Sequence, residues 1–76
     1  MDFNRPDFGK GEMELRFENE EICLYATVAG LKKMIQLCED LIQKGKETHV
    51  HLEDHEFLTE ESLNGTIALF KKRAGD

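Results

Sequence analysis

Residues 30–45 have the sequence GLKKMIQLCEDLIQKG, and this stretch decides the predicted fold. Its apolar side chains recur at the i, i+3, i+4, i+7 spacing of one face of an amphipathic helix. Gly45 is suited to end such a helix in a left-handed conformation, and Lys44 suits the negative end of the helix dipole. We therefore expect a helix that packs through one apolar stripe, with Leu37 at its margin. The stripe comprises Leu31, Met34, Ile35, Cys38, Leu41 and Ile42.

Two segments before the helix and two after it have the pattern of strands. Residues 12–18 and 21–28 alternate between apolar and polar side chains, as half-buried strands do, and Asn19-Glu20 can form a two-residue hairpin turn between them. The side chains of this hairpin that are expected to face the core are Met13, Leu15, Phe17, Ile22, Leu24, Ala26 and Val28. Residues 48–54 and 66–70 predict two further strands, and the second of these is apolar on both faces.

This ββαββ order predicts an α+β fold, a two-layer sandwich in which one helix lies across a four-stranded, mainly antiparallel sheet. A strand that is apolar on both faces is usually an interior strand, which indicates the strand order 1-2-4-3. Residues 12–72 form the single predicted domain. Residues 1–11, which contain the only proline, predict a flexible N-terminal segment, and residues 73–76 predict a C-terminal tail.

Length and charge limit the classes of function. The chain of 76 residues has room for one small core and little room for a deep active site. Its net charge of −6 disfavours binding to nucleic acid or to an anionic membrane surface. An acidic surface instead attracts basic protein partners, although acidity also serves solubility alone.

The cysteines and the N-terminal segment indicate a cytoplasmic protein. Cys23 and Cys38 are too few for a disulfide framework, and their side chains are expected to point to opposite sides of the sheet, so both thiols should be reduced. Residues 1–11 contain no apolar signal-peptide core, and no apolar run approaches the length that spans a membrane.

No motif in the sequence predicts catalysis or a bound cofactor. Ser62 has no evident base or oxyanion loop beside it, and the chain has no phosphate-binding glycine loop. His49 and His51 lie two residues apart on one face of a predicted strand, where two imidazoles could chelate an ion, and His55 follows. A zinc site needs three or four ligands, so we favour solvent-exposed histidines over a metal site. We therefore predict that the chain is not an enzyme.

A four-stranded sheet with one helix leaves its second face open, and this face is the predicted interaction surface. Tyr25 and Phe70 are candidate anchors for a protein partner, because large aromatic side chains dominate binding at interfaces. Acidic side chains in and after the third strand would attract a basic partner. The partner-binding candidates are Tyr25, His49, His51, Glu53, Asp54, Glu60, Glu61 and Phe70. An ordinary solvated face and a homodimer that pairs Tyr25 and Phe70 across a two-fold axis both remain open.

Three motifs resemble the small immunity proteins of bacterial polymorphic toxin systems, specifically immunity-protein family thirty-two. They are Gly30-Leu31 at the start of an amphipathic helix, the strand His49-Val-His-Leu-Glu-Asp54, and a final aliphatic strand. The resemblance covers residues 12–72, and the chain departs from the family in Ala68-Leu-Phe-Lys-Lys72, where members have a short apolar-acidic strand.

The resemblance implies a cytoplasmic protein that binds a cognate toxin without a covalent bond and neutralises it. On that basis the acidic candidate residues would steer the encounter with a basic toxin, while Tyr25 and Phe70 would anchor the complex. The residues alone leave two other functions open. One is a homo-oligomeric structural or interaction module, and the other is a metal-binding protein that uses His49 and His51.

Overall fold

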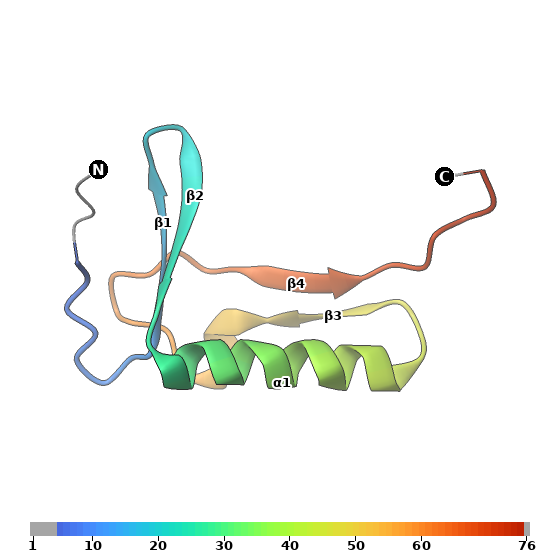
Figure 1. Cartoon of the computed structure of the whole chain (residues 1–76), viewed down its shortest axis with the longest axis horizontal. Coiled ribbons are helices and arrows are strands. Elements are labelled where there is room, and N and C mark those ends of the chain that lie inside the picture. The colour runs from blue at the N-terminus through green and yellow to red at the C-terminus, as the bar shows by residue number, and fades with distance from the viewer. Residues whose placement is uncertain (1–4, 76) are drawn as a thin grey trace.

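The computed structural model describes residues 5–75, and these residues form an α+β fold, as predicted (Figure 1). Residues 1–4 of the predicted N-terminal segment and residue 76 of the predicted tail lie outside the described residues. In chain order the elements are β1 (Met13–Glu18), β2 (Glu21–Ala26), α1 (Val28–Lys44), β3 (Thr48–His51), the 3₁₀ turn η1 (Leu52–His55) and β4 (Thr66–Leu69). No helix in the described part of the chain is both long enough and apolar enough to cross a membrane.

The strands form two separate antiparallel sheets of two strands each, β1–β2 and β3–β4. The predicted single sheet with β4 in its interior is therefore not present. The reason is that the second edge of β1 is already occupied by the segment 57–63. Thr59 N donates to Met13 O at 2.9 Å, and Leu63 N donates to Leu15 O at the same distance. Because these backbone groups are already hydrogen-bonded, this edge of β1 is not available for β4 to pair with.

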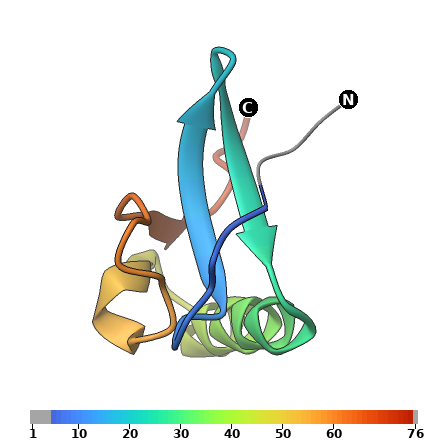
Figure 2. The ribbon, with the colours of Figure 1, turned by 90° about the vertical axis from the view of Figure 1, so that its left-hand side faces the viewer.

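The β1–β2 hairpin stands at the N-terminal end of α1 and crosses the direction of β3 and β4 (Figures 1 and 2). Asn19 and Glu20 have φ angles of 51° and 63°, so the predicted two-residue turn is confirmed, in a conformation that matches the twist of the strands. Only the base of the hairpin reaches the core, where Met13 and Leu15 are buried.

The outer part of the hairpin corrects the sequence prediction. Phe17 is opposite Ile22, and Leu15 is opposite Leu24. Phe17, Ile22 and Leu24 were expected in the core, but all three are exposed. Strand alternation placed them on the correct face of the hairpin, but this face extends beyond the elements that could cover it.

The helix begins two residues earlier than the motif at Gly30 suggested. Thr27 is the N-cap, and its Oγ1 accepts a hydrogen bond from Gly30 N at 3.1 Å. A threonine in this position satisfies a backbone donor that the first turn leaves unpaired. Val28 is therefore in the helix rather than in β2, and it is exposed. At the other end, Gly45 has a φ of 69°, as predicted for a left-handed C-cap.

The helix packs through only part of the predicted stripe: Leu41 is buried and Met34 half-buried as predicted, but the buried face is centred on Leu37, which was expected at the margin. Its buried residues are Gly30, Leu37 and Leu41, with Met34 half-buried, whereas Leu31, Ile35, Cys38 and Ile42 are exposed. Residues 30, 34, 37 and 41 and residues 31, 35, 38 and 42 have the same spacing and differ by one position, which is about 100° around the helix. The close approach of β1 selects the first set. A Cβ at Gly30 would lie 2.1 Å from Glu12 O, so only glycine fits there.

The core lies where the hairpin base, α1 and the segment after β3 meet. Its buried members are Met13, Leu15, Leu37, Leu52 and Phe57, and Ala26, Met34, Leu58 and Ile67 pack against them. The predicted strand over residues 48–54 ends at His51, because Leu52 begins η1 and turns inward. Glu56 then adopts a φ of 56°, where the chain turns into the segment 57–63 that runs alongside β1.

Candidate protein-binding site

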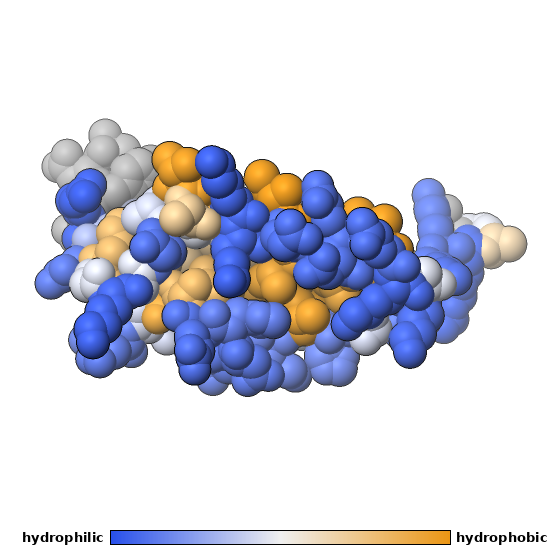
Figure 3. All heavy atoms as spheres, turned by 90° about the horizontal axis from the view of Figure 1, so that it is seen from below, coloured by the Kyte–Doolittle hydropathy of each residue, from blue (hydrophilic) through white to orange (hydrophobic). Residues whose placement is uncertain are grey.

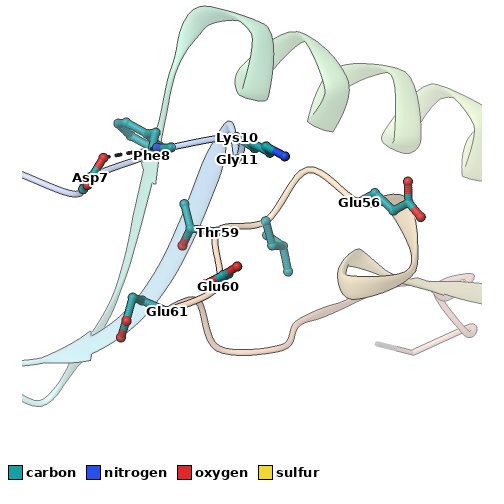
Figure 4. A pocket seen from close by; sticks show the side chains of 10 residues that line it. Asp7, Phe8, Lys10, Gly11, Glu56, Thr59, Glu60 and Glu61 are labelled. Carbon is teal, nitrogen blue, oxygen red and sulfur yellow. Dashed lines mark hydrogen bonds between the residues drawn. The ribbon is translucent and has the colours of Figure 1, made fainter.

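An acidic hollow of about 510 Å³ lies between two segments that are far apart in the sequence, residues 7–11 and residues 56–61. Figure 4 shows the lining side chains, with Asp7 and Glu61 at one end of the view and Glu56 at the other. Four carboxylates line it, those of Asp7, Glu56, Glu60 and Glu61, against one ammonium group, that of Lys10. Phe8 and Leu58 add apolar surface to the same walls. We refer to this feature as the acidic hollow.

Backbone contacts hold the two walls of the acidic hollow together. Glu12 N and Met13 N both donate to Phe57 O, at 2.7 and 3.1 Å. A Cβ at Gly11 would lie 2.8 Å from the backbone of Thr59, so glycine is needed where the segments touch. Asp7 Oδ1 accepts from Gly9 N at 3.3 Å, which orients the start of the first wall. The acidic hollow is thus built by the fold and does not depend on side-chain contacts between its carboxylates.

A buried carboxylate, Glu14, supports the wall that contains Thr59. Glu14 was expected to face water, but it is only 2% exposed. Its Oε1 accepts a hydrogen bond from Thr59 Oγ1 at 2.6 Å, and Arg16 forms an ion pair with its other oxygen. The Thr59 hydrogen bond is the main cause that holds the pKa of Glu14 below its ordinary value, together with Arg16 and against the effect of burial.

This arrangement predicts that acid destabilises the chain through Glu14. Because the folded-state pKa is lowered, the carboxylate stabilises the fold above its ordinary pKa of 4.5, and this contribution is lost as the pH falls through the folded-state pKa. Glu14→Gln should therefore be less stable than the wild type at neutral pH, and the difference should shrink in acid. Urea unfolding followed by circular dichroism at a series of pH values measures this. A stability difference that does not vary with pH would contradict the assignment.

The predicted acidic residues divide between the acidic hollow and the rest of the surface. Glu60 and Glu61 line the acidic hollow and are exposed. Glu53 has a structural role, because its Oε1 accepts a hydrogen bond from Gly65 N at 3.2 Å, and its Oε2 lies 3.6 Å from His51 Nδ1. Asp54 is exposed in η1 and is not part of the lining.

The predicted open sheet face, with Tyr25 and Phe70 as joint anchors, does not form. Tyr25 is in β2 and Phe70 follows β4, so the two aromatic residues belong to different sheets. Phe70 is exposed, whereas Tyr25 is half-buried and contacts Glu18 and Arg16 within its own hairpin. The Tyr25 hydroxyl donates to Glu18 Oε1 at 2.5 Å, and the Arg16 guanidinium lies 4.7 Å from its ring centroid. A two-fold dimer that pairs Tyr25 and Phe70 on one face loses its basis.

The contact between Tyr25 and Glu18 predicts a raised pKa for the Tyr25 phenol. The hydrogen bond to Glu18, with burial and the nearby negative charge of Glu18, raises the pKa of Tyr25 to about 12. Tyr25 is the only tyrosine and the chain has no tryptophan, so ultraviolet absorbance reports this phenol alone. Glu18→Gln should move the pKa back toward 10. The same pKa in both proteins would contradict the contact.

The histidines share a face, as predicted, but the structure does not assemble a third ligand around them. The rings of His49 and His51 meet edge to face, with 4.9 Å between their centroids. His51 Nδ1 is 3.1 Å from Thr66 Oγ1 on the neighbouring strand. His55 is in η1. Across residues 5–75, no three side chains of His, Cys, Asp or Glu come together in a way that could hold an ion.

Comparisons of the chain with protein-family models, with curated proteins and with solved structures found no match. The site must therefore be interpreted from its own residues. Glu60 and Glu61 were among the residues predicted from the sequence, whereas Asp7, Phe8 and Glu56 were not, and residues 1–11 have no periodic pattern that would indicate a site. The pair Gly9 and Gly11 was the available signal, since closely spaced glycines mark places where the backbone turns or approaches another segment.

Proposed function

We propose that this chain is a non-enzymatic cytoplasmic protein that binds a basic protein through the acidic hollow, and that the bound protein is a toxin that it neutralises. The observation that supports this most is the composition of the acidic hollow. Four carboxylates from two segments surround a space that has only one cationic side chain. The resemblance of the Gly30-Leu31 and His49–Asp54 motifs to immunity proteins supports a toxin as the partner.

The chemistry of the acidic hollow suits a lysine or arginine side chain of the partner. Carboxylates accept charge-assisted hydrogen bonds from ammonium and guanidinium groups, and arginine can bind a carboxylate with two of them. The hydrocarbon stem of either side chain would lie along Phe8 and Leu58. A toxin that acts on a polyanionic substrate needs cationic residues at its own site, so an acidic protein that covers those residues blocks the substrate.

The charge of the whole chain would increase the rate of encounter. The net charge of −6 attracts a basic protein, and such attraction raises association rates by roughly 10 to 1,000-fold and weakens as salt is added. Glu60 and Glu61 are adjacent acidic residues of the second wall, and both are exposed. They are therefore the residues through which the proposal is best tested.

The test compares two charge reversals of equal size. Tagged wild-type chain, Glu60→Lys/Glu61→Lys and Glu20→Lys/Glu21→Lys are used to capture partners from lysate of the source cells. The second pair is at the hairpin turn and its neighbouring strand position, is exposed, and changes the net charge by the same amount. We expect a basic protein that binds the wild type and the hairpin variant, with association slowed at least about tenfold for Glu60→Lys/Glu61→Lys. Equal effects of the two reversals would show that the acidic hollow is not the binding site.

A further inference from the structure

The chain exposes more surface than a folded monomer of its size should. Its accessible area is 6100 Å², whereas a monomeric protein of its mass exposes about 4,800 Å². Its radius of gyration is 14.2 Å, against about 11.4 Å for a compact chain of this length. The excess, on the order of 1,300 Å², is larger than the roughly 800 Å² that each partner buries in a standard protein interface.

Part of the exposed surface is apolar and lies on one side of α1. Val28, Leu31, Ile35 and Ile42 are 71, 50, 58 and 67% exposed, and Cys38, which lies between the last two, is also exposed. Hydrophobic side chains form a row along one margin of the molecule when it is viewed from below (Figure 3). These residues are not needed to attach the helix to the core, because Met34, Leu37 and Leu41 on another side of α1 already face it. The exposed apolar residues of α1 therefore have no packing role within the described part of the chain.

The spacing of these exposed residues indicates what covers them. Residues 28, 31, 35, 38 and 42 follow one another at intervals of three, four, three and four, which is the a/d pattern of a heptad repeat. Such a seam is complementary to another helix, since each of its side chains fits between four residues of a facing seam. We refer to these five positions as the α1 seam. The chain supplies one helix that has such a seam, so the simplest occupant is a second copy.

The charged residues beside the α1 seam would pair with those of a second copy if the two helices run antiparallel. Lys32 and Glu39 are seven residues apart, so they lie on the same flank, and they are placed about equally on either side of Ile35, the middle residue of the seam. Antiparallel helices related by a two-fold axis near Ile35 bring Lys32 of one copy opposite Glu39 of the other, twice. In a parallel pair the same flank would instead face positions 34 and 41 of the other copy, which pack toward that copy's own core. The hairpin rises from the N-terminal end of α1 (Figure 1), so each hairpin would stand at the far end of the partner's helix, where Ile42 is exposed.

We infer that the chain forms a two-fold dimer in which two α1 helices pair antiparallel through the α1 seam. This inference goes beyond the proposed function and does not depend on it, because no residue of α1 lines the acidic hollow. Each dimer would present two acidic hollows. The apolar surface that the monomer exposes becomes the core of the interface.

Sedimentation equilibrium over a range of protein concentrations tests the dimer. The wild type should have twice the monomer mass of 8.8 kDa at micromolar concentrations, and Ile35→Glu should have the single mass while keeping the helical circular dichroism of the wild type. A wild type that keeps the single mass at high concentration would overturn the dimer.

A charge exchange tests the orientation with variants that alter only exposed positions, so that folding is not at issue. Lys32→Glu makes two symmetry-related pairs repulsive and should raise the dissociation constant by at least about tenfold. Adding Glu39→Lys should restore it. Lys33→Glu makes the same change in charge one position further around the helix, away from the seam, and should leave the dimer nearly unchanged. If Glu39→Lys fails to rescue Lys32→Glu, or if Lys33→Glu is equally harmful, the antiparallel seam is wrong.

Discussion

Gly30→Ala is expected to leave the chain largely unfolded, although alanine is a better helix former than glycine by about 1 kcal/mol. The added Cβ would lie 2.1 Å from Glu12 O and 3.3 Å from the Cβ of Ala26, so the base of the hairpin would have to move away from α1. Overpacking of this kind costs about 3 kcal/mol when backbone must shift. A domain of this size gains only about 3–5 kcal/mol from its core, so the loss is close to its whole stability.

Gly45→Ala is the matched control for this prediction. Gly45 has a φ of 69°, but a Cβ there would meet nothing within 4 Å, so the cost is limited to left-handed strain of about 1–2 kcal/mol. Urea unfolding followed by circular dichroism compares the three proteins. If Gly30→Ala is as stable as the wild type, β1 does not lie against the first turn of α1.

Leu37→Ala is the second change with a large expected effect. Leu37 is buried in the core with Leu52 and Phe57, and truncation of a buried leucine costs about 2–5 kcal/mol. Ile35→Ala removes a side chain of similar size from the exposed stripe of the same helix. Measured on dilute, monomeric protein, it should change the free energy of unfolding by no more than about 0.5 kcal/mol.

The comparison between these two variants decides which face of α1 is buried. Thermal or urea unfolding at low protein concentration gives the two free energies directly. The single-stripe prediction from sequence expects Ile35 to be the more costly residue and Leu37 to be marginal. That order of effects in dilute protein would contradict the packing of the helix described above.

Local chemistry explains which features were predictable. The turn at Asn19-Glu20 and the helix end at Gly45 were predicted correctly, because each depends on one or two residues and their preferred backbone conformations. The N-terminal end was misplaced because Thr27 was assigned to a strand. It is an N-cap only if the chain turns there, and neighbouring apolar residues at 26 and 28 gave equal support to a strand.

Long-range competition explains which features were not predictable. Both stripes of α1 have helical spacing, and the choice between them is made by the approach of β1 at Gly30, a contact across 18 residues of sequence. The single sheet was predicted on the assumption that the outer edge of β1 was free, whereas the segment 57–63 occupies it through backbone bonds. Strand alternation also predicted that Glu14 faces water. The alternation pattern contains no information on Thr59, whose hydroxyl donates a hydrogen bond to the buried Glu14 carboxylate.

The same reasoning explains the outcome for the candidate site. Glu60 and Glu61 were found because a run of acidic residues in a loop is visible in the sequence. The other wall of the acidic hollow was missed because Asp7 and Phe8 are brought there by contacts of the backbone, with Gly11 against Thr59. Tyr25 and Phe70 were assigned to one surface only because a single sheet was assumed.

Growth rescue is the most direct test of the proposed function. The basic protein captured by the wild-type chain is expressed in a host cell alone, with the wild-type chain, and with Glu60→Lys/Glu61→Lys. We expect the captured protein to stop growth, the wild-type chain to restore it, and the charge-reversed chain to fail although it is folded and equally abundant. Growth that is unaffected by the captured protein, or that both chains restore equally, would contradict neutralisation through the acidic hollow.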